Sequence, residues 1–210
     1  MLQFITNQDS KLPVKDQILQ VLDGGCRWIQ IRMKEATDDE IKKLFFEIRD
    51  KAKDVDATII IDDKVDLVKQ LGPEGVAGVH LGKGDMAPAE ARLKLGPDAI
   101  IGVTANTFMD IETVRHLDID YVGIGPFALT NTKKNLAPIL GIEGIAEIMR
   151  QVKDAGIELP CVAVGGIRLE DVKPLLDAGI NGLAVSGAIA NAGNPAEAVK
   201  DFLKQLPVNE

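Results

Sequence analysis

Cysteine is scarce in this chain, and so are long apolar runs and positive charge. The only cysteines, Cys26 and Cys161, lie far apart and in no metal-binding spacing, which argues against a disulfide framework and fits a reducing compartment. No apolar run approaches the ~18–20 residues needed to span a bilayer. The formal net charge of −8 argues against a surface for nucleic acid or anionic membrane.

The first residues, MLQFITNQDSK, lack the basic head and long apolar core of a secretory signal, so the expected location is cytoplasmic. The chain has 210 residues and 46% apolar content, which fits one globular domain over residues 1–210. Because the whole molecule is acidic, an anionic ligand must be held by a local group of cations or by a metal ion.

Eight short apolar runs recur along the sequence, separated by amphipathic stretches with helical spacing. Near-continuous apolar strands that alternate with helices indicate parallel pairing with the helices outside. The repeat favours a single (β/α)8 TIM barrel. The alternative is a doubly wound open sheet, but no strand is followed by the G-x-G-x-x-G that many such sheets carry. The runs are residues 2–6, 28–33, 57–62, 78–82, 99–105, 121–125, 161–166 and 182–188.

In such a barrel, functional residues lie at the carboxyl ends of the strands. The second predicted strand continues as Gln30-Ile31-Arg32-Met33-Lys34, and side chains in a strand alternate between its two faces. Gln30, Arg32 and Lys34 therefore share one face. A half-exposed strand with a solvated face would explain them, but helices cover the outside of a parallel barrel. Since buried cations without an anion are costly, these residues predict anion binding.

Two adjacent carboxylates, Asp62 and Asp63, end the third predicted strand, and Asp85 lies just beyond the fourth. Asp62 and Asp63 point to opposite sides and cannot chelate one ion by themselves. Asp63 could simply cap the following helix. One carboxylate from each of two adjacent strand ends is instead a common way to hold Mg²⁺, which keeps waters and takes further ligands from phosphate. The predicted metal ligands are Asp63 and Asp85.

The sixth predicted strand opens into ALTNTKKN, residues 128–135, where Thr130 and Thr132 offer hydroxyls and Lys133 offers charge. A solvated polar loop is the simpler interpretation. Its place at the presumed mouth, facing Arg32 and Lys34, favours a binding role. After strands seven and eight, AVGGI and AVSGAIA supply backbone N–H groups that can surround a phosphate.

The predicted site therefore has two anion-binding ends, which suggests two phosphorylated substrates or one substrate with groups at both ends. No nucleophile–base pair is visible in the sequence. His80 is interpreted as structural and His116 as a surface residue.

Seven segments carry a resemblance to a known family; in order they are QIRMK, IIIDD, GVHLGKGD, GVTANT, YVGIGPFALTNTKK, VAVGGI and GLAVSGAI. Together they resemble the thiamine-phosphate synthase family, over roughly residues 2 to 205. The resemblance implies a (β/α)8 barrel that joins 4-amino-2-methyl-5-hydroxymethylpyrimidine diphosphate to a thiazole phosphate, with thiamine phosphate and pyrophosphate as products. It implies Mg²⁺ as cofactor and small molecules as partners, with no nucleic acid or membrane. A homodimer is compatible with this fold by analogy.

The resemblance also implies a role for each matching residue. Catalytic charge would come from Arg32, Lys34 and Lys133, and Asp63 and Asp85 would hold Mg²⁺ on the diphosphate. The implied substrate-binding residues are Gln30, Ile31, Arg32, Met33, Lys34, Asp62 and Thr104 for the pyrimidine diphosphate, with Lys133 on the diphosphate itself, Thr130, Asn131 and Thr132 for the thiazole partner, and Gly166, Val185 and Ser186 for the thiazole phosphate.

Some positions depart from the family pattern. Asp62 stands where Asn is usual, Thr104 where Ser is usual, and Asn106 and Leu129 replace a frequent His and a frequent Pro. Two rival functions stay open: a thiazole tautomerase-like isomerase, which would need only the thiazole phosphate end, and a catalytically silent phospholigand binder. Mg²⁺-dependent ligand binding is expected of the synthase and of neither rival.

Overall fold

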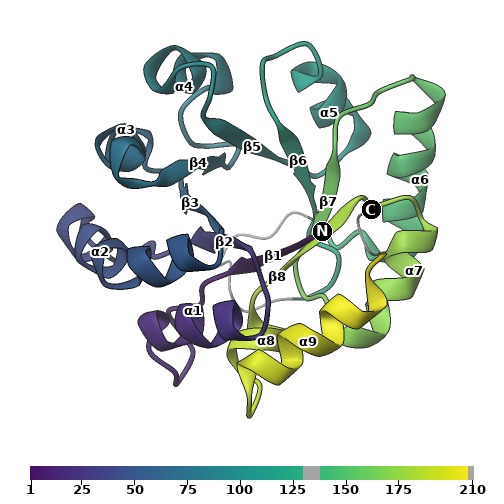
Figure 1. The fold of residues 1–210 in the computed structure, drawn as a ribbon. Coiled ribbons are helices and arrows are strands. Elements are labelled where there is room, and N and C mark those ends of the chain that lie inside the picture. The colour runs from purple at the N-terminus through teal and green to yellow at the C-terminus, as the bar shows by residue number, and fades with distance from the viewer. Residues whose placement is uncertain (130–137, 208–210) are drawn as a thin grey trace.

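The eight expected strands form one closed, all-parallel barrel in chain order, with β8 pairing back onto β1. The computed structural model describes residues 1–129 and 138–207. Closure confirms the (β/α)8 barrel and overturns the doubly wound open sheet (Figure 1). The strands are β1 (Leu2–Ile5), β2 (Trp28–Ile31), β3 (Thr58–Asp62), β4 (Val76–Leu81), β5 (Ile100–Ala105), β6 (Tyr121–Ile124), β7 (Cys161–Val164) and β8 (Gly182–Val185).

Helices surround the ring of strands (Figure 1). In the described ranges they are α1 (Val14–Asp23), α2 (Asp38–Asp54), α3 (Val65–Leu71), α4 (Pro88–Leu95), α5 (Phe108–Val114), α6 (Gly141–Asp154), α7 (Val172–Asp177), α8 (Gly187–Ala190) and α9 (Pro195–Gln205), with short 3₁₀ turns at Gly72–Glu74 and Leu169–Asp171. None of the helices described is both long and apolar enough to cross a membrane.

Local sequence signals set several helix ends. The Thr37 side chain accepts a hydrogen bond from the Glu40 backbone N–H, and the Glu40 carboxylate accepts one from the Thr37 N–H, so a capping box starts α2 as expected. Gly156 and Gly179 follow α6 and α7 with φ of 62° and 96°, the left-handed conformation that ends helices. These contacts are local, which explains why the sequence alone predicts them.

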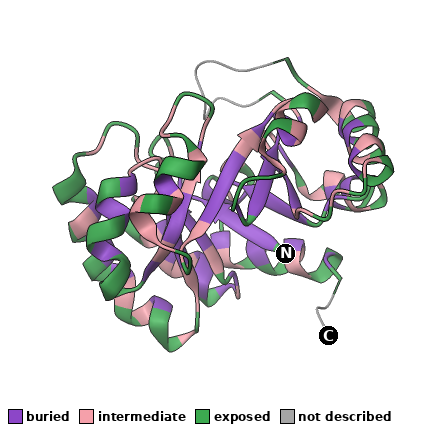
Figure 2. Ribbon diagram, turned by 90° about the horizontal axis from the view of Figure 1, so that it is seen from above, coloured by how far each residue is buried: buried purple, intermediate pink, exposed green. Residues whose placement is uncertain are grey.

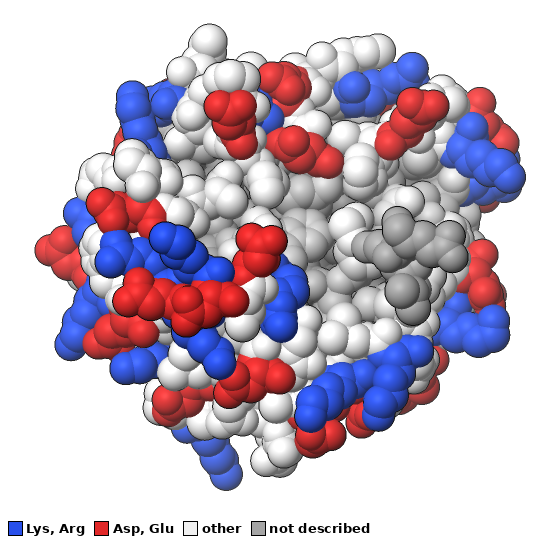
Figure 3. Space-filling view, in the orientation of Figure 1, with Lys and Arg blue, Asp and Glu red and all other residues white. Residues whose placement is uncertain are grey.

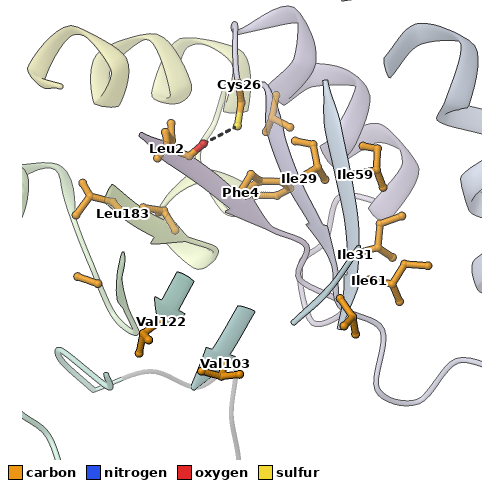
Figure 4. Packing of buried hydrophobic residues seen from close by; sticks show 14 of the residues in the cluster. Leu2, Phe4, Cys26, Ile29, Ile31, Ile59, Ile61, Val103, Val122 and Leu183 are labelled. Atoms are coloured by element: carbon orange, nitrogen blue, oxygen red, sulfur yellow. Dashed lines mark hydrogen bonds between the residues drawn. The ribbon is translucent and has the colours of Figure 1, made fainter. Parts of the chain in front are cut away.

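The main hydrophobic core lies between the barrel and its helices. Alternate strand residues point outward into it, among them Ile29 and Ile31 from β2 and Ile59 and Ile61 from β3, which lie on the same side in Figure 4. All four are at most 1% exposed. Figure 2 shows the same arrangement, with buried strands at the centre and exposed helix faces outside. The opposite set of strand residues is therefore free to fill the barrel or to line a site.

Inside the barrel a smaller cluster packs around Tyr121, which is 3% exposed and meets the Trp28 ring edge-on at a centroid distance of 4.8 Å. Room for this ring comes from Gly102 on the neighbouring strand β5. A Cβ atom at position 102 would overlap the Tyr121 ring. A glycine that looks like a weak strand residue is thus required by an aromatic side chain 19 positions later in the chain.

Gly102→Ala is expected to destabilise the fold, because either Tyr121 or β5 must move to admit the new methyl group. We expect a loss of about 3 kcal/mol, as for other overpacked cores, and a fall in Tm of about 6–12 °C for a chain of this size. Thermal denaturation followed by circular dichroism measures it. Gly193→Ala is the control, since a Cβ there meets nothing within 4 Å. Equal melting temperatures for the two variants would contradict this account.

The barrel end at which the N-terminus lies carries structural ion pairs. Arg92 of α4 donates to the carbonyl oxygens of Gly96 and Ala99 at 2.9 and 2.6 Å, and its guanidinium lies 2.9 Å from the Asp120 carboxylate. Among the side chains drawn on this face in Figure 3, cations and carboxylates are interspersed and form no continuous basic surface. The contacts of Arg92 join α4 to the segments that lead into β5 and β6.

Candidate active site

A cavity of about 930 Å³ opens at the carboxyl ends of the strands. Its walls come from all eight strand ends and the loops that follow them, which is where barrel enzymes carry their sites. The predicted residues that line it are Gln30, Arg32, Lys34, Asp62, Asp85, Thr104, Gly166 and Ser186. Tertiary structure thus brings together residues that are 156 positions apart in the sequence.

Other predicted residues lie elsewhere. Ile31 and Val185 are at most 1% exposed and belong to the outer core, and Met33 packs against that core, so these three side chains do not reach the cavity (Figure 4 for Ile31). Any contact they make with a substrate would come from their backbone groups. Thr130, Asn131, Thr132 and Lys133 lie outside the described residues, and their roles stay predictions.

Three inward residues at the end of β2 and just beyond it, Gln30, Arg32 and Lys34, converge on Asp62, whose side chain is only 10% exposed. Gln30 Nε2 donates to Asp62 Oδ1 at 2.8 Å. Lys34 Nζ lies 2.8 Å and Arg32 Nε 3.6 Å from Asp62 Oδ2, both as ion pairs. From the sequence, these cations are expected to bind an anionic ligand. The structure shows that the Asp62 carboxylate already pairs with both cations within the protein.

The charged form of Lys34 is favoured. Burial would lower its pKa, but the attraction of Asp62, with smaller contributions from Asp85 and Asp63, outweighs burial and raises the pKa. Lys34 is therefore an ammonium group surrounded by carboxylates, and its side chain is still 42% exposed. It can turn toward an anion in the cavity without leaving its place in the fold.

Thr6 holds the segment that carries Arg32 and Lys34. Strand β2 ends at Ile31, yet the alternation of side chains continues beyond it. The buried Thr6 hydroxyl accepts a hydrogen bond from the Arg32 N–H at 2.8 Å and donates one to the Arg32 carbonyl at 3.0 Å. One side chain thus extends the β1–β2 pairing and keeps the cations pointing inward.

Asp63 and Asp85 form the second acidic group. The Asp63 N–H donates to the His80 carbonyl at 2.8 Å, and the residue has φ of 70°, a conformation that a non-glycine residue adopts at some cost. Asp85 Oδ2 accepts the Gly82 N–H at 2.6 Å, which fixes the loop after β4. The alternative prediction, that Asp63 caps the following helix, is wrong. Lys64 is the residue before α3, and no side-chain hydrogen bond caps that helix.

The electrostatics of this pair suit the binding of a cation. Burial raises the pKa of Asp63, and the nearby Asp85 carboxylate raises it further, while Lys34 opposes the shift. Within residues 1–129 and 138–207, no group of three or more His, Cys, Asp or Glu side chains could hold a metal. Two carboxylates are what Mg²⁺ takes when water and substrate phosphate supply its other ligands. Asp63 and Asp85 therefore suit a metal shared with a phosphorylated ligand.

Comparison with known proteins identifies the family. A family model described as thiamine monophosphate synthase matches residues 2–189. The chain belongs to the thiamine monophosphate synthase family. It is therefore an enzyme, a transferase of thiamine biosynthesis.

Individual relatives agree with this assignment. A thiamine-phosphate synthase from Bacteroides fragilis is 47% identical over 202 residues, covering 96% of this chain and 98% of the relative. One from Flavobacterium johnsoniae is 41% identical over 211 residues, covering 99% and 97%. The solved thiamine phosphate pyrophosphorylase from Pyrococcus furiosus superimposes with a TM-score of 0.83 at 27% identity, over 97% of this chain and 94% of that one.

In this member of the thiamine monophosphate synthase family, the cavity wall includes polar residues that the sequence analysis did not assign to the site. His80, interpreted there as structural, lines the cavity and lies 3.0 Å from Thr104 Oγ1 through Nε2. Its Nδ1 is 2.9 Å from Tyr121 Oη, which accepts from Gln3 Nε2 at 3.2 Å. The available signal was alternation: Gln3 is the polar inward position of an otherwise apolar LQFIT run.

The end of the cavity next to β7 and β8 is built from small residues. Gly166 has φ of 70°, and a Cβ there would come within 2.7 Å of the Leu129 carbonyl oxygen. Only glycine allows this close approach of the chain after β6. Ser186 Oγ is buried and has no hydrogen-bond partner within the part of the chain that the structure describes. An unpartnered buried hydroxyl in a ligand cavity suits a hydrogen bond to a ligand.

Proposed function

We propose that this enzyme condenses 4-amino-2-methyl-5-hydroxymethylpyrimidine diphosphate with a thiazole phosphate, carboxylated or not, to give thiamine phosphate and pyrophosphate. The names of the similar proteins support the product, and the residues of the cavity support the chemistry. The observation that carries the proposal is that Lys34, on the cavity wall beside Arg32, pairs with Asp63 and is attracted by Asp85. That combination suits a diphosphate held with a metal ion.

In the proposed site, Asp63 and Asp85 would hold Mg²⁺, which acts as a Lewis acid on the leaving diphosphate. Arg32 and Lys34, with Lys133 from the 128–135 segment, would supply fixed positive charge where negative charge develops. Gln30 and Asp62 would face the pyrimidine, and Thr104 the pyrimidine or the diphosphate. Ile31 and Met33 would contribute only backbone groups.

The second substrate would bind at the β7–β8 end. Ser186 Oγ, the backbone at Val185 and the space left by Gly166 would surround the thiazole phosphate, with Thr130, Asn131 and Thr132 on the thiazole itself. In this scheme the C–O bond to diphosphate ionises first, and the thiazole nitrogen captures the resulting pyrimidine cation. The protein orients the two substrates and excludes misaligned attack, so no general base is needed.

The rival functions require less of this site. A thiazole tautomerase-like isomerase would use the β7–β8 end and leave Asp63, Asp85 and Lys34 without a role. A silent phospholigand binder would have no need for a metal-suited pair of carboxylates beside two cations. The geometry at the β2–β4 end therefore favours the synthase.

The proposal is tested by mixing purified protein with both substrates in Mg²⁺ or in EDTA and measuring thiamine phosphate and pyrophosphate together. Equal amounts of both products, formed only with Mg²⁺, are expected. Formation of neither product, with either form of the thiazole and with a folded protein, would refute the synthase. Isomerisation of the thiazole alone would establish the tautomerase instead.

We further infer one domain over residues 1–210, a cytoplasmic location, and small molecules as the partners rather than nucleic acid or membrane. Cys26 and Cys161 are free and buried, and burial raises the pKa of each thiol to about 11, which suits thiols kept reduced and unreactive. A homodimer is the proposed assembly, and light scattering on the purified protein tests it.

A further inference from the structure

A line of hydrogen-bonded side chains runs from the inside of the barrel to the cavity wall. It begins at Gln3 on β1, passes through Tyr121 on β6 and His80 on β4, and ends at Thr104 on β5, with contacts of 3.2, 2.9 and 3.0 Å. Gln3 and Tyr121 are 1% and 3% exposed. Buried polar groups must be paired, so the donor and acceptor at each contact are constrained.

Two glycines leave the space that this line of side chains occupies. Gly102 leaves the space that the Tyr121 ring fills, and a Cβ at Gly123 would come within 3.1 Å of His80 Cε1. Both glycines sit at inward positions of strands β5 and β6. The two rings are therefore held in place by the barrel walls and not by a flexible loop.

The hydrogens can be assigned from one end to the other. Gln3 Nε2 can only donate, so Tyr121 Oη accepts from it. Within the described residues the Tyr121 hydroxyl has two hydrogen-bond contacts, with Gln3 Nε2 and His80 Nδ1, so its own hydrogen goes to His80 Nδ1. Burial raises the pKa of Tyr121, which keeps the phenol protonated. A neutral imidazole that accepts at Nδ1 carries its hydrogen on Nε2 and donates it to Thr104 Oγ1.

We propose that Gln3, Tyr121 and His80 are positioning residues that fix the Thr104 hydroxyl as a hydrogen-bond donor into the cavity. With its oxygen already accepting from His80, Thr104 directs its own hydrogen toward the substrate. The hydroxyl then meets an acceptor atom of the pyrimidine diphosphate without any rearrangement at the moment of reaction. Threonine suits this role because its β-branched side chain has few rotamers.

The functional part of this inference rests on the proposed synthase activity, but the direction of the line does not. If the Gln3 amide had the opposite orientation, every hydrogen bond would reverse: Tyr121 would donate to Gln3, His80 would carry its hydrogen on Nδ1, and Thr104 would donate to His80. The tautomer of His80 in the protein without ligand therefore decides the direction.

The tautomer can be read by ¹⁵N NMR of protein labelled at histidine, at about pH 8.5, where imidazole is generally neutral. The chain has two histidines, His80 and the exposed His116, so the His116→Gln variant assigns the signals. The expected result is the Nε2–H tautomer for His80, partly lost in Tyr121→Phe. The Nδ1–H tautomer in the unmodified sequence would overturn the proposal, whatever the synthase assay shows.

The functional test uses a matched pair at position 80. The amide nitrogen of Gln overlays His Nε2 and keeps a donor for Thr104, whereas that of Asn overlays Nδ1 and does not. His80→Gln is expected to retain about tenfold more kcat/KM for the diphosphate substrate than His80→Asn, the size of one hydrogen bond of about 1.4 kcal/mol. Melting temperatures of the two variants check that both fold.

Equal activity for the two folded variants, or higher activity for His80→Asn, would overturn the positioning role. His116→Gln should match the unmodified enzyme, because His116 lies in an exposed turn after α5. If the enzyme itself formed no thiamine phosphate, the proposed function would fail, while the tautomer would still report on the line of hydrogen bonds.

Discussion

Asp85→Asn is expected to lower kcat/KM by about 100-fold at limiting Mg²⁺, the usual cost of removing one charge-stabilising group from an active site. Asparagine keeps an oxygen that can accept the Gly82 N–H, so the loop after β4 should hold its shape while the metal-binding charge is lost. Part of the activity should return in excess Mg²⁺, because a weakened site is filled again by mass action. A Mg²⁺ titration of initial rates measures both effects.

The variant also predicts a stability change that needs no substrate. In the protein without metal, burial and the Asp85 charge raise the pKa of Asp63 above its unfolded value. Above that folded-state pKa the ionised Asp63 costs stability, and the cost is removed as pH falls below the unfolded pKa. Removing the Asp85 charge should relieve part of this cost near neutral pH, so Asp85→Asn should melt no lower than the unmodified protein without Mg²⁺ and should lose any rise in Tm caused by Mg²⁺.

Asp171→Asn is the matched control, since Asp171 Oδ2 accepts the Arg168 N–H at 2.8 Å in the same arrangement, three residues apart, as Asp85 and Gly82. It should keep normal activity and the normal response to Mg²⁺. An Asp85→Asn enzyme that was fully active in EDTA would remove Asp85 from the metal site.

Lys34→Met is expected to lower kcat/KM by about 100-fold, by removing a fixed charge from the diphosphate end of the cavity. Methionine retains much of the apolar stem, and Asp62 keeps its contacts with Gln30 and Arg32, so the fold should survive. The loss should appear with saturating Mg²⁺ as well, which distinguishes it from the metal-ligand variant. Steady-state rates at several Mg²⁺ concentrations provide the measurement.

Lys51→Met is a close control for this substitution. Lys51 and Lys34 have the same side-chain exposure of 42%, and each has a carboxylate oxygen within 2.7–2.8 Å, but Lys51 pairs with Asp23 on the outside of the barrel. Exposed ion pairs contribute only about 0–1 kcal/mol, so this variant should resemble the unmodified enzyme. Similar activities for Lys34→Met and Lys51→Met would show that Lys34 does not act on the substrate.

Much of this architecture was predictable because its signals are local. The eight apolar runs locate all eight strands to within three residues. Alternation along QIRMK predicts that Gln30, Arg32 and Lys34 share a face, and all three do line the cavity. The parallel barrel follows from strands that alternate with helices, and a parallel barrel places its strand ends around one mouth. Strand-end position in a parallel barrel is therefore enough to place Asp85 and Lys34 at one site.

Contacts between strands could not be read in the same way, since they depend on register and on the direction of individual side chains. The convergence of Gln30, Arg32 and Lys34 on Asp62 requires β2 and β3 to pair with their ends level, which the sequence does not state. The same applies to the line from Gln3 to Thr104, in which each contact joins two different strands, over 118, 41 and 24 positions of sequence. His80 consequently looked structural from its neighbours VHLG alone.

The amino-acid sequence by itself determined the barrel, the end of it that carries function and the residue types available there, because periodicity and strand-end position act over a few residues. Tertiary structure alone decided that Asp62 meets the two cations and that His80 meets Thr104. Those meetings depend on strand register, on the space left by Gly102 and Gly123, and on the charges each side chain finds across the cavity. Pairing at a distance is a property of the folded chain.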